Sequence, residues 1–193
     1  MMAEVVLYHH AQGLTKGVEG FADELRRAGH TVHLPDLFEG RTFDNLDDGV
    51  AYASSVGFDT ILERGVAAAD GLGDGLVFAG FSLGVMPAQN LAQTHAGAKG
   101  ALLFQSCLPV SEFGEAWPAG VPVQIHGMAS DPFFAGEGDI DAARELVDSV
   151  AVAELFVYPG DKHLFADSSL SSYDEEAAAL LTARSLNFLE GIR

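Results

Sequence analysis

A serine between two glycines marks the place where the chain changes from one structural period to another. The motif Gly80-Phe81-Ser82-Leu83-Gly84 follows the apolar run 76–79, and the residues after it have helical spacing. A sharp turn from a strand into a helix needs glycine wherever backbone packs directly on backbone. Such a turn lifts the serine hydroxyl above a sheet, which is the geometry of a nucleophile elbow in serine hydrolases. The alternative interpretation is a purely structural strand-to-helix turn.

The whole chain alternates between short apolar runs and segments with helical periodicity. The runs predict strands at 4–8, 31–34, 76–79, 100–104, 121–125 and 153–158. The periodic segments predict helices at 17–28, 58–69 and 140–150, another that begins at Leu83, and a last one that starts from a capping box at Ser172 and runs towards Ile192. This alternation predicts the α/β class, with a mostly parallel sheet of about six or more strands between two layers of helices.

Length and composition limit the classes of protein to consider. The 193 residues are 48% hydrophobic and no linker or repeat divides them, so we expect a single domain over residues 1–193. A formal net charge of −18 argues against nucleic-acid partners and against anionic membranes, and no apolar run is long enough to span a bilayer. The N-terminus has no signal-peptide features and Cys107 is the only cysteine, so we expect a cytoplasmic protein, either a monomer or a small homo-oligomer.

Three residues suited to nucleophilic chemistry lie in loops that follow predicted strands. Ser82 follows the third strand, Asp131 the fifth and His163 the sixth. Parallel sheets bind ligands beyond the carboxyl ends of their strands, so we expect these loops to meet. A histidine can take the serine proton near neutral pH, and an aspartate can hold its imidazole in the required tautomer. The order Ser, Asp, His is the one expected of α/β-hydrolases.

Each member of this set also has a structural interpretation. His163 is otherwise a solvated loop histidine, and Asp131 is otherwise a turn aspartate before a proline. Asp139, Asp141 and Asp161 are rival acids, although Asp161 is too near His163 in sequence for easy triad geometry.

A tetrahedral intermediate also needs backbone N–H donors. Leu83, directly after Ser82, supplies one, and Ala11 in the loop after the first strand is the favoured source of the second. His9 and His10 are adjacent on an extended segment, so their side chains face opposite ways and do not easily share an ion. Cys107 is more readily a small packed residue than a nucleophile. We therefore expect neither a metal nor a cofactor.

Several segments resemble the dienelactone hydrolase family. They are Tyr8 to Gly13, Leu25 to His30, Leu34 to Phe38, the elbow, Gly127 to Asp131 and Pro159 to Phe165. The resemblance spans almost the whole chain and implies a small α/β-hydrolase without a large lid. It places the triad on Ser82, Asp131 and His163, and the oxyanion N–H groups on Ala11 and Leu83.

The chain departs from the founding members of that family at three positions. They use cysteine where this chain has Ser82, a glutamate where it has His10, and an arginine for a substrate carboxylate where it has Asp167. Because Asp167 and the net charge repel anions, we expect a neutral substrate, although Arg41 and Arg64 could still turn into the site. The candidate substrate contacts are His10, Phe38, Phe81 and Phe133.

Three functions of different classes fit these observations. The first is a serine hydrolase of small carboxylic esters or lactones that forms an acyl-enzyme at Ser82. The second is another acyl-handling enzyme on the same fold, such as an acyltransferase, a thioesterase or a peptidase. The third is a non-catalytic binding protein that kept the fold, because a fold does not prove a function.

Overall fold

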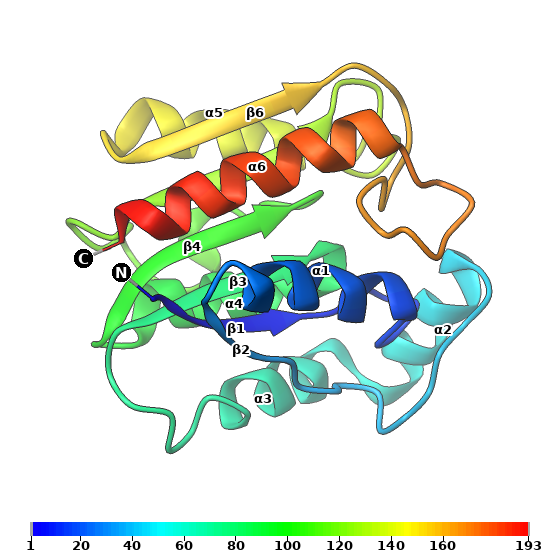
Figure 1. Cartoon of the computed structure of the whole chain (residues 1–193), viewed down its shortest axis with the longest axis horizontal. Helices are drawn as coiled ribbons and strands as arrows, with labels where there is room; N and C mark the ends of the chain where they lie inside the picture. The colour runs from blue at the N-terminus through cyan, green and yellow to red at the C-terminus, as the bar shows by residue number, and fades with distance from the viewer. Residues whose placement is uncertain (1, 193) are drawn as a thin grey trace.

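The computed structural model describes residues 2–192 and is built on one parallel sheet (Figure 1). Its six strands are ordered β2-β1-β3-β4-β5-β6, and every neighbouring pair runs parallel. The strands are β1 (Glu4–Tyr8), β2 (Thr31–His33), β3 (Leu76–Phe81), β4 (Ala98–Phe104), β5 (Val123–Met128) and β6 (Ala153–Tyr158). All six predicted strands are present, with ends shifted by up to three residues.

Helices cover both faces of the sheet. They are α1 (Lys16–Arg27), α2 (Leu46–Val56), α3 (Phe58–Ala67), α4 (Val85–Thr94), α5 (Asp139–Ser149) and α6 (Glu175–Gly191), with short 3-10 turns η1 (Ser82–Gly84) and η2 (Val110–Glu112). Apolar residues of α1 and α6 form one buried cluster with the sheet, on the face towards the viewer in Figure 1, and those of α2 to α5 form a second cluster on the other face. The predicted three-layer α/β-hydrolase arrangement is confirmed.

The inner strands are mostly apolar because both faces of the sheet are covered there. In β3 all six residues are buried, and the same holds for β5. A strand buried on both sides reads as a continuous apolar run rather than as an alternation of polar and apolar residues. That is the pattern from which the sequence predicts these strands.

The cap of α6 and the presence of α2 differ from the prediction. Asp174, not Ser172, caps α6 and accepts the N–H of Ala177, whereas the Ser172 hydroxyl donates to the carbonyl of Leu164. Helix α2 was not predicted at all. It buries only Gly49 and Ala53, so it lacks the stripe of large apolar residues that marks an amphipathic helix.

The strand order reverses between β1 and β3, which are neighbours although β2 lies between them in the chain. Connections leave the sheet to opposite sides at such a point, and the loops there leave room for a ligand. The loops after β1, β3, β5 and β6 carry the predicted triad and the predicted oxyanion donors. Among residues 2–192, no helix combines the length and the apolar character needed to cross a bilayer.

Candidate active site

The end of β3 and the sharp turn after it require both glycines of the motif. Ser82 has a φ of +47°, a left-handed conformation that is uncommon outside glycine. A Cβ at Gly80 would meet the carbonyl of Gly84, and a Cβ at Gly84 would meet the carbonyls of Tyr8 and His9. The close approach of Gly80 to Gly84 closes the turn, and the close approach of Gly84 to Tyr8 and His9 packs the loop after β1 against the turn.

His163 connects Ser82 to Asp131. Its Nε2 lies 2.8 Å from Ser82 Oγ, and its Nδ1 lies 2.7 Å from Asp131 Oδ2. Asp131 is fully buried, and its Oδ1 accepts the N–H of Phe133 at 2.9 Å. When Nε2 accepts the serine proton, Nδ1 carries the other hydrogen, and Asp131 is placed to hold that tautomer. The structure thus brings together the three predicted residues in the order that a triad requires.

The two predicted oxyanion donors lie beside this array. Ala11 and Leu83 line the same cavity as Ser82. Leu83 is the second residue of η1, and the first N–H groups of a helix have no partner within it. The Ala11 N–H has no acceptor within residues 2–192. Both groups are therefore free to donate to a charge that develops near Ser82.

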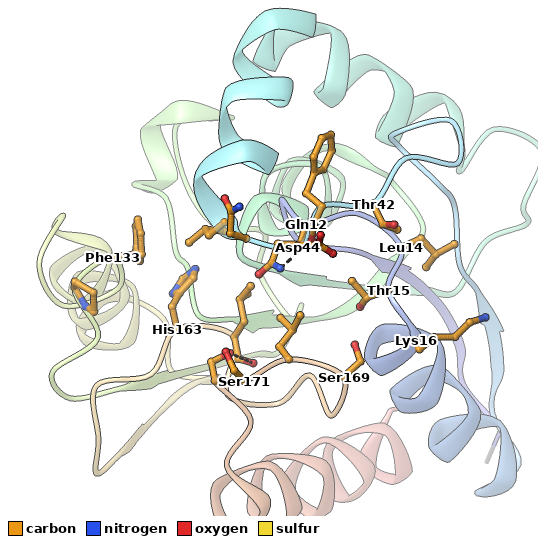
Figure 2. Close-up of a pocket in the computed structure, with 17 residues that line it drawn as sticks. Gln12, Leu14, Thr15, Lys16, Thr42, Asp44, Phe133, His163, Ser169 and Ser171 are labelled. Carbon is orange, nitrogen blue, oxygen red and sulfur yellow. Dashed lines mark hydrogen bonds between the residues drawn. The ribbon is translucent and has the colours of Figure 1, made fainter.

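Two cavities meet at His163 and Phe133, whose rings pack with their centroids 4.7 Å apart. The larger cavity has a volume of about 780 Å³ and extends from His163 to Lys16 on α1 (Figure 2). The smaller, of about 360 Å³, contains Ser82 and has mainly apolar walls, with Met86 among the lining residues. Phe133 therefore lies where a substrate contact was predicted.

Three other predicted substrate contacts are corrected by the structure. Phe38 is fully buried against His9 and Tyr52, and Phe81 packs on Phe21 and Phe104 in the opposite core cluster. His10 is fully buried as well. None of the three lines either cavity at the turn. A position in or beside a loop does not decide whether a ring faces the ligand or the core.

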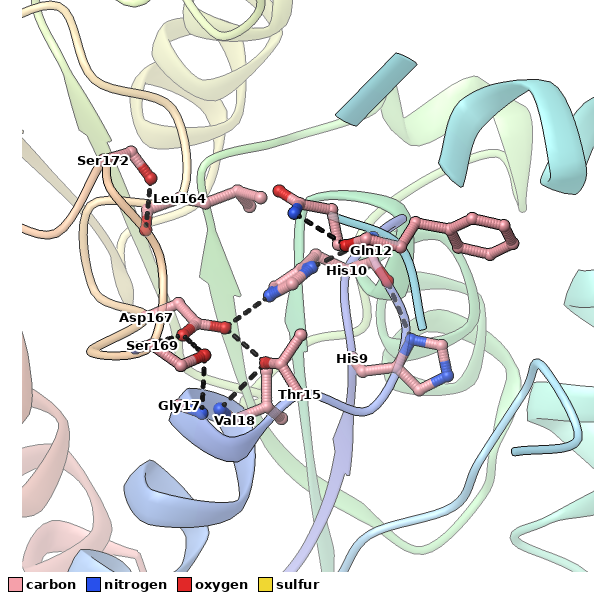
Figure 3. Close-up of polar contacts among 11 residues, drawn as sticks. His9, His10, Gln12, Thr15, Gly17, Val18, Leu164, Asp167, Ser169 and Ser172 are labelled. Carbon is pink, nitrogen blue, oxygen red and sulfur yellow. Dashed lines mark hydrogen bonds and ion pairs between the residues drawn. The ribbon is translucent and has the colours of Figure 1, made fainter. Parts of the chain in front are cut away.

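His10 instead belongs to a polar network under the larger cavity (Figure 3). Its Nδ1 accepts the N–H of Gln12 at 3.2 Å, so its Nε2 carries the hydrogen that is donated to Asp167 Oδ2 at 2.8 Å. Asp167 also accepts from the hydroxyls of Thr15 and Ser169. Burial alone would raise the pKa of Asp167, but these hydrogen bonds outweigh burial and lower it to about 2. Asp167 is therefore ionised and its partners are neutral, so the negative charge that is expected to repel an anionic substrate remains.

The remaining polar candidates have other roles. His9 and His10 face opposite ways, as predicted: His9 Nε2 accepts the N–H of Leu37 at 2.9 Å. Burial raises the pKa of the Cys107 thiol to about 12, which fits a packed residue better than a nucleophile. Within residues 2–192, no three His, Cys, Asp or Glu side chains form a group that could hold a metal ion. Arg64 donates to the carbonyl of Leu37 and does not line either cavity.

The loop after β4 contributes wall residues that were not predicted. Gln105 and Ser106 line the smaller cavity together with Asp139, which had been considered only as a rival acid. The Ser106 hydroxyl donates to Asp139 Oδ2 at 2.6 Å. Burial raises the pKa of Asp139, and the hydrogen bonds from Ser106 and Cys107 oppose that rise. Their position in the sequence could have indicated this, because Gln105 and Ser106 follow an apolar strand just as Ser82 does.

A model of the dienelactone hydrolase family matches residues 2–192. The chain belongs to this family. Membership makes it an ester hydrolase, and the predicted resemblance is confirmed. No curated protein matches the sequence significantly.

Solved structures agree with this family assignment. A candidate dienelactone hydrolase from Klebsiella pneumoniae subsp. pneumoniae MGH 78578 is 21% identical with a TM-score of 0.76, covering 98% of this chain and 87% of its own. A dienelactone hydrolase-like promiscuous phosphotriesterase from metagenomic libraries is 20% identical with a TM-score of 0.72, covering 98% and 86%. A thermophilic esterase of Thermogutta terrifontis is 17% identical with a TM-score of 0.64, covering 98% and 83%. At these identities the likeness establishes the fold alone.

Proposed function

We propose that this member of the dienelactone hydrolase family is a serine hydrolase of small carboxylic esters or lactones. The observation that carries the proposal is the continuous set of hydrogen bonds from Ser82 Oγ through His163 to Asp131, with lengths of 2.8 and 2.7 Å. A hydroxyl is a weak nucleophile until a base takes its proton, and the hydrogen-bonding distance between His163 and Ser82 supports His163 in that role.

The first half-reaction forms an acyl-enzyme. His163 Nε2 takes the proton as Ser82 Oγ attacks the ester carbonyl, and the buried Asp131 stabilises the imidazolium. The N–H groups of Ala11 and Leu83 donate to the carbonyl oxygen as it becomes negative. His163 then gives the proton to the leaving oxygen, and the C–O bond of the ester breaks.

The second half-reaction returns the enzyme to its starting state. A water molecule gives a proton to His163 and attacks the acyl carbon, with the same two N–H groups around the oxyanion. When the intermediate collapses, Ser82 leaves and takes the proton back from His163. In a lactone the alcohol stays attached to the acid, so the product is one hydroxy acid.

A panel of neutral short-chain aryl esters and lactones tests this proposal with the purified protein. We expect hydrolysis of neutral substrates, and a lower kcat/KM for carboxylate-bearing analogues of equal size, because Asp139 and Glu137 line the smaller cavity and Lys16 is paired with Glu19. The difference should narrow at high salt. Added alcohol distinguishes acyl transfer from hydrolysis, because a transferase converts it into a new ester. Absence of turnover across the panel would leave a binding protein instead.

A further inference from the structure

Gln105 is the most anomalous residue near Ser82. Among residues 2–192, four buried side-chain polar atoms have no hydrogen-bond partner, and two of them are Nε2 and Oε1 of this one amide. Its side chain is fully buried, and its backbone has a φ of +59°, in the left-handed region. Buried amides are normally paired, and strained backbone persists where the surroundings enforce it, often at functional sites.

The position of Gln105 relates this anomaly to the candidate chemistry. The residue lies in the wall of the smaller cavity, which also contains Ser82. Its neighbours in that wall are already satisfied, since Ser106 donates to Asp139 and Asp139 also accepts the N–H of Cys107. The Gln105 amide, by contrast, has no partner among residues 2–192. Several other residues that line the cavity are apolar, among them Val50, Phe58, Met86 and Leu108.

The geometry of the reaction decides which part of a substrate occupies this cavity. The leaving oxygen receives its proton from His163, so the leaving group lies on the His163 side. His163 lines both cavities, whereas Ser82, Ala11 and Leu83 line only the smaller one. The larger cavity is therefore assigned to the leaving group, and the smaller one, which holds the nucleophile and both N–H donors, to the acyl group.

We infer that Gln105 is a specificity-determining residue that binds a hydroxyl group on the acyl part of the substrate. A hydroxyl donates to Oε1 and accepts from Nε2, so one neutral group satisfies the amide. The amide atoms are covered in the unliganded protein, so contact with a substrate hydroxyl requires the side chain to turn towards the cavity. The preferred substrate class is then neutral esters or lactones of hydroxylated short-chain acids. This inference rests on the proposed function.

The test compares p-nitrophenyl 3-hydroxybutyrate with p-nitrophenyl butyrate, which differ only by the hydroxyl. We expect the wild type to favour the hydroxylated ester about 10-fold in kcat/KM, because the unsubstituted acyl group leaves the amide unpaired. In Gln105→Met the preference should fall to about 1, because the apolar side chain offers the hydroxyl no hydrogen-bond partner. Its melting temperature should be unchanged or higher, because an apolar side chain removes an unpaired buried group.

Gln124→Met is the matched control. Gln124 on β5 also has a buried Oε1 without a partner, but it lies away from Ser82, beside Glu154 and Phe156. We expect this variant to keep the wild-type preference. If Gln105→Met does not fold, the preference between the two esters is measured in Gln105→Leu instead.

Two results would overturn the inference while leaving the proposed function in place. One is a wild type that hydrolyses both esters at the same kcat/KM. The other is a Gln105→Met protein that gains thermal stability and keeps the preference, which would mean that the amide is a packing defect or holds a buried water. If neither ester is hydrolysed and Ser82 does not react with a phosphonate, the proposed function itself fails, and the inference fails with it.

Discussion

His10 Nε2 lies 2.8 Å from Asp167 Oδ2, and this buried hydrogen bond joins the loop after β1 to the loop after β6. The first loop carries Ala11 and the second carries His163. Because His10 also accepts the N–H of Gln12, it fixes the backbone on the far side of Ala11. The pair therefore holds a candidate oxyanion donor and the candidate base in a constant relative position, without contact to substrate.

Breaking this pair should lower kcat more than it changes KM. We expect Asp167→Ala and His10→Phe to lose about 10- to 100-fold in kcat, because small displacements of reacting groups reduce rates strongly. Asp167→Asn keeps an acceptor for His10 and should lose less. His33→Phe removes a half-exposed histidine–carboxylate pair with Glu4 and should stay within about 2-fold. Equal losses in all four variants, or a change confined to KM, would contradict a positioning role.

The same carboxylate should make stability depend on acid pH. The folded-state pKa of Asp167 is about 2, whereas an unfolded aspartate has a pKa of ~3.9. The stabilisation is therefore complete above pH 4 and is lost as pH falls towards 2, on the order of 2 kcal/mol in the free energy of unfolding. Urea unfolding at several pH values measures it. Asp167→Asn should remove this part of the acid dependence, and an unchanged slope in the variant would refute the assignment.

Replacing Gly80 by alanine should destabilise the protein much more than replacing a glycine that has open space around it. A Cβ at Gly80 meets a backbone carbonyl, which cannot move aside as a flexible side chain can. We expect Gly80→Ala to lower the free energy of unfolding by ~1–3 kcal/mol and to reduce activity. Gly73 has open space around the corresponding position, so Gly73→Ala should be neutral or slightly stabilising. Chemical denaturation of both variants makes the comparison.

Asp131 and Asp139 should be distinguishable as partners of His163. We expect Asp131→Asn to keep its fold by circular dichroism and to lose about 10³- to 10⁴-fold in kcat, because the imidazole loses the support of its tautomer. Asp139→Asn should lose less than about 10-fold, since Asp139 bonds to Ser106 and not to His163. The exposed Asp161→Asn serves as the control. A larger loss in Asp139→Asn than in Asp131→Asn would reverse the two roles.

The sequence predicts the sheet well because a parallel sheet covered on both faces makes its strands mostly apolar. It predicts where Ser82, Asp131 and His163 lie because each follows such a strand, and the carboxyl ends of parallel strands meet at one edge. It does not predict α2, whose buried side is Gly49 and Ala53. Because these two side chains are small, the segment lacks the periodic pattern of large apolar residues that predicts a helix.

The residues that surround the candidate triad are harder to predict from the sequence than the triad itself. His10 and Asp167 are 157 residues apart, and nothing in either segment shows that the two side chains meet. Phe38 and Phe81 follow the same strand-end rule as Phe133, yet two of the three rings face the core. Which way a loop side chain turns depends on packing between segments distant in the sequence.

Reaction with a fluorophosphonate probe, followed by mass spectrometry of the labelled peptide, tests the central claim most directly. The probe forms a covalent bond to an activated serine and needs no knowledge of the substrate. We predict one label per wild-type chain, on Ser82, with no label and at least about 10³-fold less esterase activity in Ser82→Ala. A Ser82→Ala protein that still takes up the label, or a folded wild type that hydrolyses esters without ever labelling Ser82, would contradict the account.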